Sequence, residues 1–593
     1  MKLSIFAVIF AVLFYSVPGH AQQSKLSADL AWAEPNSNVH VIVRYKNPPS
    51  SIQHQKAISG GGIVRADLGL INSGAYTIPA SRLQTLAADP EVEFIGVDHP
   101  VHSFLDNTAA AVNAPFAWHS FGLDGTGIGV AIIDSGITDV EDLRSPLSSR
   151  VVYRENFIHA HTAEDYYGHG QHVSGIVAGD GADSICSKCV RTFRGIAPAA
   201  HLIDLRVLDR NGDGADSFVI AAIQRAITLK SAYNIRVINL SLGHPVVESY
   251  QTDPLCQAVE KAWKAGIVVV VAAGNDGRDN SFGNNGYGTI GSPGNDPYVI
   301  TVGAMKSMGT PQRDDDRIAS YSSKGPTSID HIVKPDMVAP GNQVVSLRAP
   351  AGSLPDLYPA NDVPLNYYEL TSSTAISSKY FTLSGTSMAA PVVSGAVALL
   401  LQAHPTLTPD QVKARLMLTT YKTFPESSTT VDPTTGQSFT SYYDPFTVGA
   451  GYLDIQAALL DNHLFTGVAN SPVASYQPGS HGRPGVTSIS CGPLSICTRN
   501  ASASANHSPS SDPDSDSDGS GIQTVSGNQS VWSNQSVWSN QSVWSNQSIW
   551  SNQSIWSNQS VWSNQSIWSN QSVWSNSATQ SPEAVLIRIL GEN

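Results

Sequence analysis

Short runs of Val and Ile recur between residues 113 and 460, and amphipathic segments separate them. Apolar runs bounded by helical segments indicate strands that are buried on both faces, as in a parallel sheet covered by helices. We therefore expect an α/β fold built in layers around a central parallel sheet. The predicted strands are GIGVAIIDSGI (127–137), HLIDLRVLD (201–209), IRVINLSLG (235–243), GIVVVVAAGN (266–275) and YVITVGA (298–304).

Three polar residues lie at or just past the carboxyl ends of these strands: Asp134, Ser241 and Asn275. In open parallel sheets, ligands bind outside the carboxyl ends of the strands. The sequence thus predicts a functional site at this edge of the sheet.

Length and charge limit the function classes. At 593 residues the chain exceeds one ordinary domain. Its formal net charge of −14 argues against a nucleic-acid partner, which requires a basic surface. We interpret the acidity as a contribution to solubility.

The N-terminal stretch MKLSIFAVIFAVLFYSVPGHA (1–21) has a Lys, a short apolar run and a G-x-A ending. This pattern predicts a secretory signal peptide cleaved near Ala21, with an uncleaved membrane anchor as the alternative. We expect residues 22–107 to form a small α+β domain, near the lower size limit for an independent core. Its predicted elements are the strands HVIVRY (40–45) and VEFIGVDHPVH (92–102) and the helix ASRLQTLAADP (80–90).

Composition changes after the α/β region. Residues 464–525 are rich in Ser, Pro and Asp, which predicts a flexible linker. Residues 526–577 repeat SNQSVW or SNQSIW with a period of six, and residues 578–593 contain one predicted strand. A step of six turns an α-helix by about 600° and scatters the Trp side chains, whereas an extended chain keeps them on one face. The repeat is therefore predicted to be β-like.

Three forms of the repeat fit this period: a β-solenoid, stacked short strands, or an adhesive tail without fixed structure. A row of Trp rings would suit contact with a surface polysaccharide or a cell surface, and packing of the repeats on one another is the alternative. Each NQS is also an N-glycosylation sequon, for a host that glycosylates its secreted proteins.

Four of the five cysteines lie in two close pairs, Cys186 with Cys189 and Cys491 with Cys497. Export would permit a disulfide in each pair, and half of a zinc site is the alternative for Cys-x-x-Cys. Cys256 falls at a helical apolar spacing and is predicted to be a buried core thiol.

Three motifs bring chemistry to the α/β region: IIDSG with Asp134, GHGQHVSGIVAG with His169, and GTSMAAP with Ser387 at a helix start. A serine hydroxyl is a poor nucleophile at neutral pH unless a neighbouring base, usually His, takes its proton and a third group orients that base. These residues can meet if their elements share one edge of the sheet. Pro391 is expected in the first helical turn, where its missing N–H would be unpaired.

In the order of Asp134, His169 and Ser387, and in the motifs around them, residues 125–460 resemble the subtilases, the subtilisin-like serine peptidases. The resemblance implies a subtilisin-like three-layer α/β fold with a central parallel sheet, and hydrolysis of peptide bonds. Further matching motifs are GIAPAAHL, VINLSLG, VVVAAGN, YSSKGP, KPDMVAPG and GAGYLDIQAAL.

The resemblance assigns roles to single residues. Ser387 would be the nucleophile, His169 the general base and later the acid to the leaving amine, and Asp134 the group that orients His169. Asn275 would donate its side-chain amide to the oxyanion, together with the backbone N–H of Ser387 at a helix start. His172 is predicted to be a helix-packing residue.

Substrate contacts follow from the same resemblance. Ser241, Leu242 and Gly243 would form an edge that pairs with the backbone of an extended peptide as an added strand. His244, which follows this edge, could narrow or polarise a substrate subsite. The segment GSPG (291–294) could shape the pocket for the side chain before the cut.

Residues 22–107 resemble the family's propeptide, which is a folding template and an inhibitor whose cleaved end lies in the cleft. We expect self-cleavage between His102 and Asn113, with an unrelated accessory domain as the alternative. The peptidase domain is expected at residues 108–463. The Cys186–Cys189 loop and residues 350–380 look like insertions that either rim the cleft or decorate the surface.

No cofactor is expected for the chemistry, and no residue is assigned to a metal. DRNGDG (209–214) is similar to a calcium loop, but an EF-hand needs Glu at its twelfth position, which here is Ile220. The resemblance allows structural calcium elsewhere, without named ligands.

The favoured function is a secreted serine endopeptidase, extracellular or at the cell surface, that is made as a self-processed zymogen. Its expected partners are polypeptide substrates and its own propeptide. The alternatives are a processing peptidase with one substrate, and a catalytically silent binding protein on a peptidase scaffold. The complete set of Asp134, His169, Asn275 and Ser387 argues against the silent protein.

Overall fold

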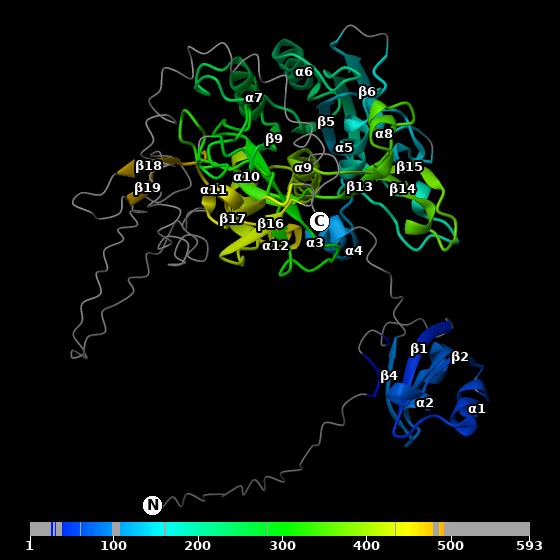
Figure 1. Ribbon diagram of the computed structural model, residues 1–593. Coiled ribbons are helices and arrows are strands. Elements are labelled where there is room, and N and C mark those ends of the chain that lie inside the picture. Colours follow the sequence, from blue (N-terminus) through cyan, green and yellow to red (C-terminus); the bar gives the residue numbers. More distant parts are fainter. Residues whose placement is uncertain are drawn as a thin grey trace, which may run out of the picture. The chain divides into compact units, whose positions relative to one another are not determined.

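The computed structural model describes residues 25–27, 30, 38–59, 61–97, 107–146, 148–158, 162–281, 283–432, 435–477 and 486–490. The chain forms two compact units, Met1–His102 and Ser103–Asn593 (Figure 1). The predicted signal peptide, the Trp repeat, the last predicted strand and Cys491 with Cys497 lie outside the described residues.

The N-terminal unit is an antiparallel sheet with strand order β2-β3-β1-β4. In β1 (Asn38–Tyr45), Val41 and Val43 are buried and their neighbours less so, which is the two-residue period of a strand with one face on a core. The predicted strands and helix are present. The other elements are α1 (Ser51–Ser59), β2 (Ile63–Leu68), β3 (Ser73–Pro79), α2 (Leu83–Ala87) and β4 (Val92–Val97).

In the described part of the chain, the larger unit is built on an eight-stranded sheet of order β11-β10-β9-β8-β5-β7-β6, with β12 paired to β10. All pairs are parallel except β10 with β11. The predicted α/β fold and the five predicted strands are confirmed. The strands are β5 (Gly129–Asp134), β6 (Val151–Asn156), β7 (His201–Arg206), β8 (Ile235–Leu240), β9 (Val268–Ala272), β10 (Ile300–Lys306), β11 (Arg317–Ile318) and β12 (Met337–Pro340).

Helices cover both faces of this sheet and make three layers (Figure 1). One face carries α5 (His169–Ala178) against α9 (Thr386–Ala403), and the other carries α6 (Asp216–Leu229) against α7 (Pro254–Lys264). Strands β5 and β9 are buried along their whole length, because helices shield both of their faces. The remaining helices are α3 (Asn107–Ala111), α4 (Ala114–Ser120), α8 (Ser353–Leu357), α10 (Pro409–Thr419), α11 (Pro445–Val448) and α12 (Ile455–Leu460).

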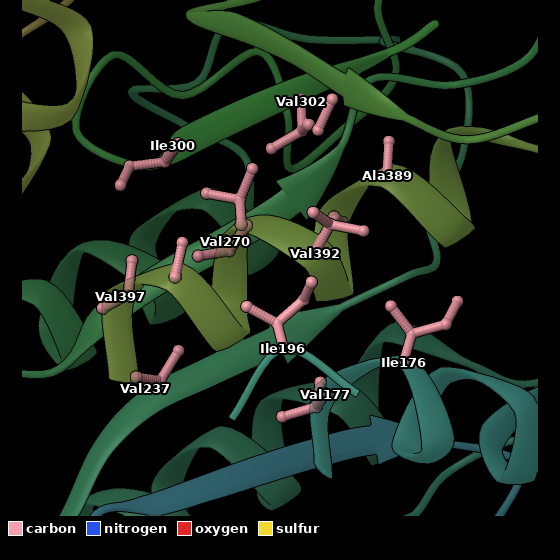
Figure 2. Packing of buried hydrophobic residues seen from close by; sticks show 14 of the residues in the cluster. Ile176, Val177, Ile196, Val237, Val270, Ile300, Val302, Ala389, Val392 and Val397 are labelled. Atoms are coloured by element: carbon pink, nitrogen blue, oxygen red, sulfur yellow. The ribbon is translucent and has the colours of Figure 1, made fainter. Parts of the chain in front are cut away.

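Helix α9 is the central helix of the core. Figure 2 shows its Val392 and Val397 among apolar side chains of β8, β9 and β10. Among the described helices, α9 alone is long and apolar enough to span a membrane, but 83% of it is buried inside the unit, as in a core helix. From residue 386 to residue 401, only Ser387 is not buried.

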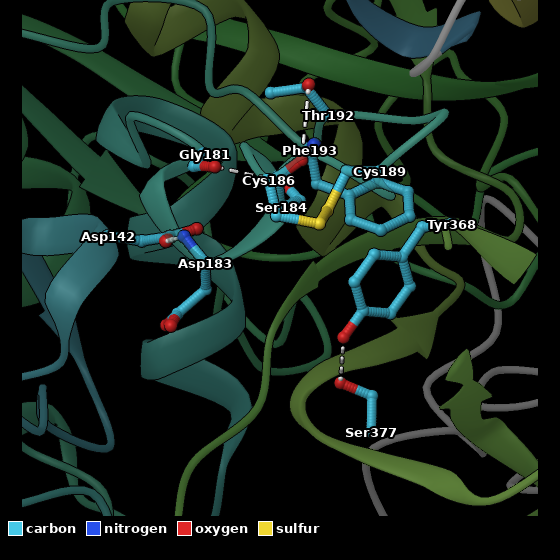
Figure 3. Close-up of a disulfide and its surroundings, with 10 residues drawn as sticks. All are labelled: Asp142, Gly181, Asp183, Ser184, Cys186, Cys189, Thr192, Phe193, Tyr368 and Ser377. Atoms are coloured by element: carbon cyan, nitrogen blue, oxygen red, sulfur yellow. Dashed lines mark hydrogen bonds between the residues drawn. A yellow bond between two sulfur atoms is a disulfide. The ribbon is translucent and has the colours of Figure 1, made fainter. Parts of the chain in front are cut away.

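The two predicted insertions meet each other. Cys186 and Cys189 form a disulfide (Figure 3), so their sulfurs are not free to bind a metal. The loop pairs with the second insertion through a bridge between Cys189 and Glu369. The rings of Phe193 and Tyr368 pack edge-on beside it, 5.7 Å between centroids (Figure 3). The second insertion carries β14 (Asp362–Pro364) and β15 (Ile376–Leu383), which pair with each other, and β15 also pairs with β13 (Val344–Leu347).

The domain boundary predicted between residues 107 and 108 needs correction. The division between the two units falls between His102 and Ser103, and α3 belongs to the larger unit. Ala109 and Ala111 of α3 are buried in the core of that unit. A five-residue helix of small side chains is too short to give a periodic signal in the sequence.

The linker predicted from residue 464 also begins too early. Residues 464–477 continue the larger unit, and the backbone N–H of Ala469 donates to Oδ1 of Asp410 at 2.7 Å. Strand β18 (Val473–Gln477) follows and pairs with β19 (Val486–Ser490). Strands β16 (Ser427–Val431) and β17 (Ser438–Tyr442) form a separate antiparallel pair.

A chain that ends at residue 463 should be less stable than one that ends at residue 490. The shorter chain loses hydrogen bonds made by Ala469, Pro472 and Ala474 to the core. At about 1 kcal/mol each, this loss lowers the free energy of unfolding by about 3 kcal/mol. Thermal unfolding of both purified chains measures the difference. Equal midpoints would contradict the assignment of residues 464–477 to the unit.

Candidate active site

Asp134, Ser241 and Asn275 lie at one edge of the central sheet. Asp134 is the last residue of β5, Ser241 directly follows β8, and Asn275 comes three residues after β9. Strands β5, β8 and β9 are neighbours and run parallel. Their carboxyl ends therefore meet, and the strand order alone brings the three residues together.

His169 is the first residue of α5, and its Nδ1 lies 2.8 Å from Oδ1 of Asp134, which is 1% exposed. Because a carboxylate only accepts hydrogen bonds, Nδ1 carries the hydrogen and Nε2 is left as an acceptor. Burial lowers the pKa of His169, but the charge of Asp134 and the hydrogen bond to it outweigh burial and raise this pKa above its ordinary value. The pair of Asp134 and His169 thus leaves Nε2 of His169 as a nitrogen that can accept a proton.

Asp165, which the sequence analysis missed, holds the turn that presents His169. Its carboxylate accepts the backbone N–H groups of Tyr167, Gly168 and Gln171, which would otherwise be free at the start of α5. Gly168 has φ of 113°, a conformation that favours Gly. An Asp three residues before a Gly at a helix start is the signal that could have found this cap.

Ser387, the second residue of α9, faces Ser241. The Ser387 hydroxyl donates to the Ser241 carbonyl at 3.2 Å, and the Ser241 hydroxyl donates to the Ser387 carbonyl at 2.8 Å. In the described residues, no hydrogen bond joins Ser387 to His169. The Ser387 hydroxyl is therefore held beside the edge that follows β8.

The position predicted for Pro391, in the first helical turn, is wrong. Pro391 is the sixth residue of α9, so its missing N–H leaves the carbonyl of Ser387, four residues earlier, without a partner inside the helix. The Ser241 hydroxyl satisfies that carbonyl. This hydrogen bond, made to the carbonyl that Pro391 leaves free, links α9 to the segment that follows β8.

Asn275 lies beside the start of α9. Its Oδ1 accepts the backbone N–H of Thr386 at 2.9 Å and the Thr386 hydroxyl at 3.1 Å. A Cβ on Gly385 would lie 3.4 Å from Nδ2 of Asn275 and 3.6 Å from the backbone N of Ser387; Oδ1 of Asn275, which accepts from Thr386, is also 3.6 Å away. Two N–H donors therefore border one small space, which stays open because residue 385 is Gly with φ of 150°. Such a space suits a negatively charged oxygen.

Comparison with known proteins identifies the family. The family model described as "Subtilase family" matches residues 125–444. The chain belongs to the subtilase family.

Curated relatives agree with the family match. The subtilase is 37% identical to the serine protease AprX of Bacillus subtilis over 358 residues, 58% of this chain and 73% of that protein. It is 32% identical to subtilisin E of Bacillus subtilis over 443 residues, 73% of this chain and 94% of that protein. It is 31% identical to an extracellular serine proteinase of a Thermus strain over 389 residues, which is 62% of this chain and 77% of that protein. The chain is a serine endopeptidase, a hydrolase of peptide bonds.

The subtilase presents an open edge next to Ser387. In the described residues, the backbone N–H and C=O groups of Leu242 and Gly243 take part in no hydrogen bond. On the other side, a Cβ on Gly243 would lie 2.5 Å from the carbonyl of Ser292, so the close approach of these segments requires Gly. His244 then pairs with Ser292 in an antiparallel bridge. The edge is thus held on one side by the segment around Ser292, while the backbone groups of Leu242 and Gly243 stay available for pairing with another strand.

Two further histidines of the subtilase differ in role. His172 is buried, with Nε2 at 3.0 and 3.1 Å from the carbonyl oxygens of Val344 and Phe381. Burial lowers its pKa to about 3, so His172 stays neutral and packs α5, as expected. Nε2 of His244 lies 3.5 Å from Oδ2 of Asp216, which places a carboxylate beside the residue that follows the open edge at 241–243.

The insertion at residues 350–380 rims the site. The N–H of Leu354 in α8 donates to the carbonyl of Tyr167 at 2.9 Å, and the ring centroids of Tyr167 and His169 are 6.4 Å apart. The Tyr167 ring also meets Gly212, where a Cβ would lie 2.7 Å from the ring. In this DRNGDG loop, Asp209 accepts N–H groups of its own turn.

Proposed function

We propose that Asp134, His169 and Ser387 form the catalytic triad of a secreted serine endopeptidase that is made as a zymogen and processes itself. The space beside Gly385 carries this proposal, because it joins two N–H donors to the one hydroxyl of α9 that is not buried. A nucleophile and a site for the developing charge are thereby built into one helix start.

In this proposal, Ser387 attacks the carbonyl carbon of the scissile peptide bond. Its hydroxyl first rotates from the Ser241 carbonyl toward Nε2 of His169, which takes the proton. The carbonyl oxygen becomes an oxyanion. The C–N bond then breaks, His169 gives its proton to the leaving amine, and an acyl-enzyme remains on Ser387. A water molecule, deprotonated by His169, releases the second product by the same path.

Electrostatics favour each charge that develops in this sequence. The buried Asp134 carboxylate stabilises the imidazolium form of His169, in line with its raised pKa. Nδ2 of Asn275 and the backbone N–H of Ser387 stabilise the oxyanion. The N-terminus of α9 adds its positive end at the same point.

The substrate is a polypeptide in an extended conformation. The residues Ser241, Leu242 and Gly243 supply the edge for its backbone, and a backbone contact reads few side chains. We assign the segment GSPG (291–294) and His244 to the walls of the subsites for the residues before the cut. This arrangement supports activity on many sequences.

We assign the N-terminal unit to the propeptide that follows a signal peptide at residues 1–21. The cut was expected between His102 and Asn113. Because Thr108, Ala109 and Ala111 are buried in the larger unit, a peptidase has no access to them, and we place the cut before Asn107.

A serine-directed fluorophosphonate tests the assignment of the nucleophile. The reagent bonds its phosphorus to an activated serine oxygen and releases fluoride. Peptide mapping by mass spectrometry should find the adduct on Ser387 alone, in proportion to the activity lost. An adduct on another serine, or inhibition without any adduct, would overturn the assignment. Urea-unfolded protein is the control and should not react.

A further inference from the structure

Lys413, in α10, is completely buried, and its ammonium nitrogen lies inside a set of oxygen atoms. Nζ is 2.9, 3.2 and 2.9 Å from the carbonyl oxygens of residues 297–299, in chain order. The Ser471 hydroxyl at 2.9 Å and Oδ1 of Asp336 at 3.1 Å complete the set. We call these five oxygens the oxygen cage.

The oxygen cage consists of the ligands that hard cations prefer: carbonyl, hydroxyl and carboxylate oxygens. The Ser471 hydroxyl donates its own hydrogen to Oδ1 of Asp336 at 2.5 Å, so it offers only lone pairs to Lys413. All five atoms are therefore acceptors, and a neutral amine would point its lone pair at another oxygen. Burial lowers the pKa of Lys413 to about 7, against the attraction of Asp336. The geometry of the cage favours the ammonium form.

A second lysine limits the charge that the oxygen cage can accept. Nζ of Lys334 lies 2.7 Å from Oδ2 of Asp336 and also donates to the Val299 carbonyl of the cage at 3.0 Å; both of these charged side chains are completely buried. Lys334 therefore already balances the Asp336 carboxylate. A further acid, Asp296, interacts with both lysines. Without Lys413, the cluster would carry at most one unbalanced negative charge, which suits a monovalent cation better than a divalent one.

We propose that the oxygen cage is a monovalent-cation site that Lys413 fills from within the chain, so that this part of the fold needs no bound metal ion. The empty cage would take a cation of ammonium or potassium size, because its oxygens lie 2.9–3.2 Å from Nζ. Calcium requires oxygens at about 2.3–2.6 Å. The structural calcium that the family resemblance allows does not fit here, because the position is filled.

The oxygen cage and Lys413 join four distant parts of the chain, one of which holds Asp336. Residues 297–299 follow the segment 291–294, whose Ser292 pairs with His244 behind the substrate edge. Ser471 belongs to residues 464–477, and Lys413 to α10. Because the Lys413 ammonium is part of the chain, a chelator cannot remove it, whereas a metal ion at the same position could be removed.

The Lys413→Ala variant tests this inference by removing the ammonium and the three methylenes next to it. The full chain with Ser387→Ala is the host, and the readout is thermal unfolding, which does not depend on the proposed catalytic function. In tetramethylammonium chloride, the midpoint should fall by about 5–10 °C. Potassium, ammonium or propylammonium chloride at the same ionic strength should restore at least half of the loss, and calcium chloride should not. The host itself should give one midpoint in all the monovalent salts, and in calcium chloride the variant is compared with the host in the same salt, so that calcium bound elsewhere cancels.

Lys422→Ala is the matched control. Nζ of Lys422 donates to the carbonyls of Met417 and Ala450 and to the Thr420 hydroxyl, with no carboxylate among its partners in the described residues. This variant should lose stability without recovery in any of the salts. If Lys413→Ala unfolds at the same midpoint in potassium, ammonium and tetramethylammonium chloride, the inference is wrong. If the variant does not fold at expression, its refolding yield in the same salts decides, and equal yields would overturn the inference.

Discussion

Replacement of Ser387 by Ala should lower kcat for peptide hydrolysis by about 10⁶-fold, the magnitude known for loss of the nucleophilic serine in subtilisin, a member of the same family. The change removes the one hydroxyl of α9 that is not buried. It leaves the backbone N–H of residue 387, the amide of Asn275 and the edge at residues 241–243 in place. KM should therefore change little, because substrate binding does not use the lost oxygen.

Initial rates on a chromogenic peptide and on denatured protein measure this effect. Ser378→Ala, which removes an exposed hydroxyl on β15, is the control and should keep full activity. The Ser387→Ala chain should also persist as an uncleaved precursor, because self-processing needs the same nucleophile. Activity within tenfold of the unmodified enzyme would show that another residue attacks the substrate.

Replacement of Asp134 by Asn should lower kcat by about 10⁴-fold, as known for the corresponding change in other serine peptidases. In the unmodified enzyme, Nδ1 of His169 donates to Oδ1 of Asp134. An asparagine amide can present its own N–H₂ group to Nδ1, which places the imidazole hydrogen on Nε2. That tautomer cannot accept a proton from Ser387. The variant also loses the negative charge that stabilises the imidazolium.

The same variant should shift the pH dependence. His169 must be neutral to act as a base, so activity is lost as the pH falls through its pKa. Because Asp134 raises this pKa, the ascending limb of kcat/KM should lie above the ordinary His value of about 6.5. Without the carboxylate charge the limb should move to lower pH.

Profiles of kcat/KM from acid to alkaline pH measure this shift. Asp139→Asn is the control, since Asp139 lies on the loop after β5 and pairs with Arg144 near the surface. It should leave both the rate and the limb unchanged. An ascending limb at the same pH in Asp134→Asn and the unmodified enzyme would mean that Asp134 does not set the pKa of His169.

The strands that could be predicted are those with continuous apolar runs. The five predicted strands lie in the buried middle of the sheet, where helices cover both faces and most residues are apolar. In this sheet, the strands that were not predicted are β6, β11 and β12. In β6 (Val151–Asn156) only the first residue is buried, and β11 has two residues, so neither leaves a clear pattern. β12, at four residues, is fully buried but too short to stand out.

The residues of the candidate site also fall into two groups, those that the sequence predicted and those that it did not. Asp134, His169 and Ser387 could be found because each stands in a local motif at an element end. Asp165 leaves only the weak signal of an Asp three residues before a Gly at a helix start. The role of Gly385 could not be found, because it consists of open space bordered by neighbouring groups. Chain order does not record such contacts.

The boundaries and the oxygen cage show the limit of sequence reasoning most clearly. Residues 464–477 are included in the predicted linker because the whole stretch 464–525 is rich in Ser, Pro and Asp, yet contacts with Asp410 and Asp336 bind them to the core. Lys413 reads as an ordinary helix lysine until the fold surrounds it with oxygens from other segments.

The sequence by itself determined the layered α/β architecture and the chemical identity of the proposed triad, because apolar periodicity and motif residues are local properties of the chain. Only the tertiary structure decided which groups meet. It placed the Ser241 hydroxyl on the carbonyl that Pro391 leaves free. It opened the space beside Gly385 between two N–H donors, and it enclosed the Lys413 ammonium. Each of these depends on the distance between atoms far apart in the chain, which strand order and helix packing set.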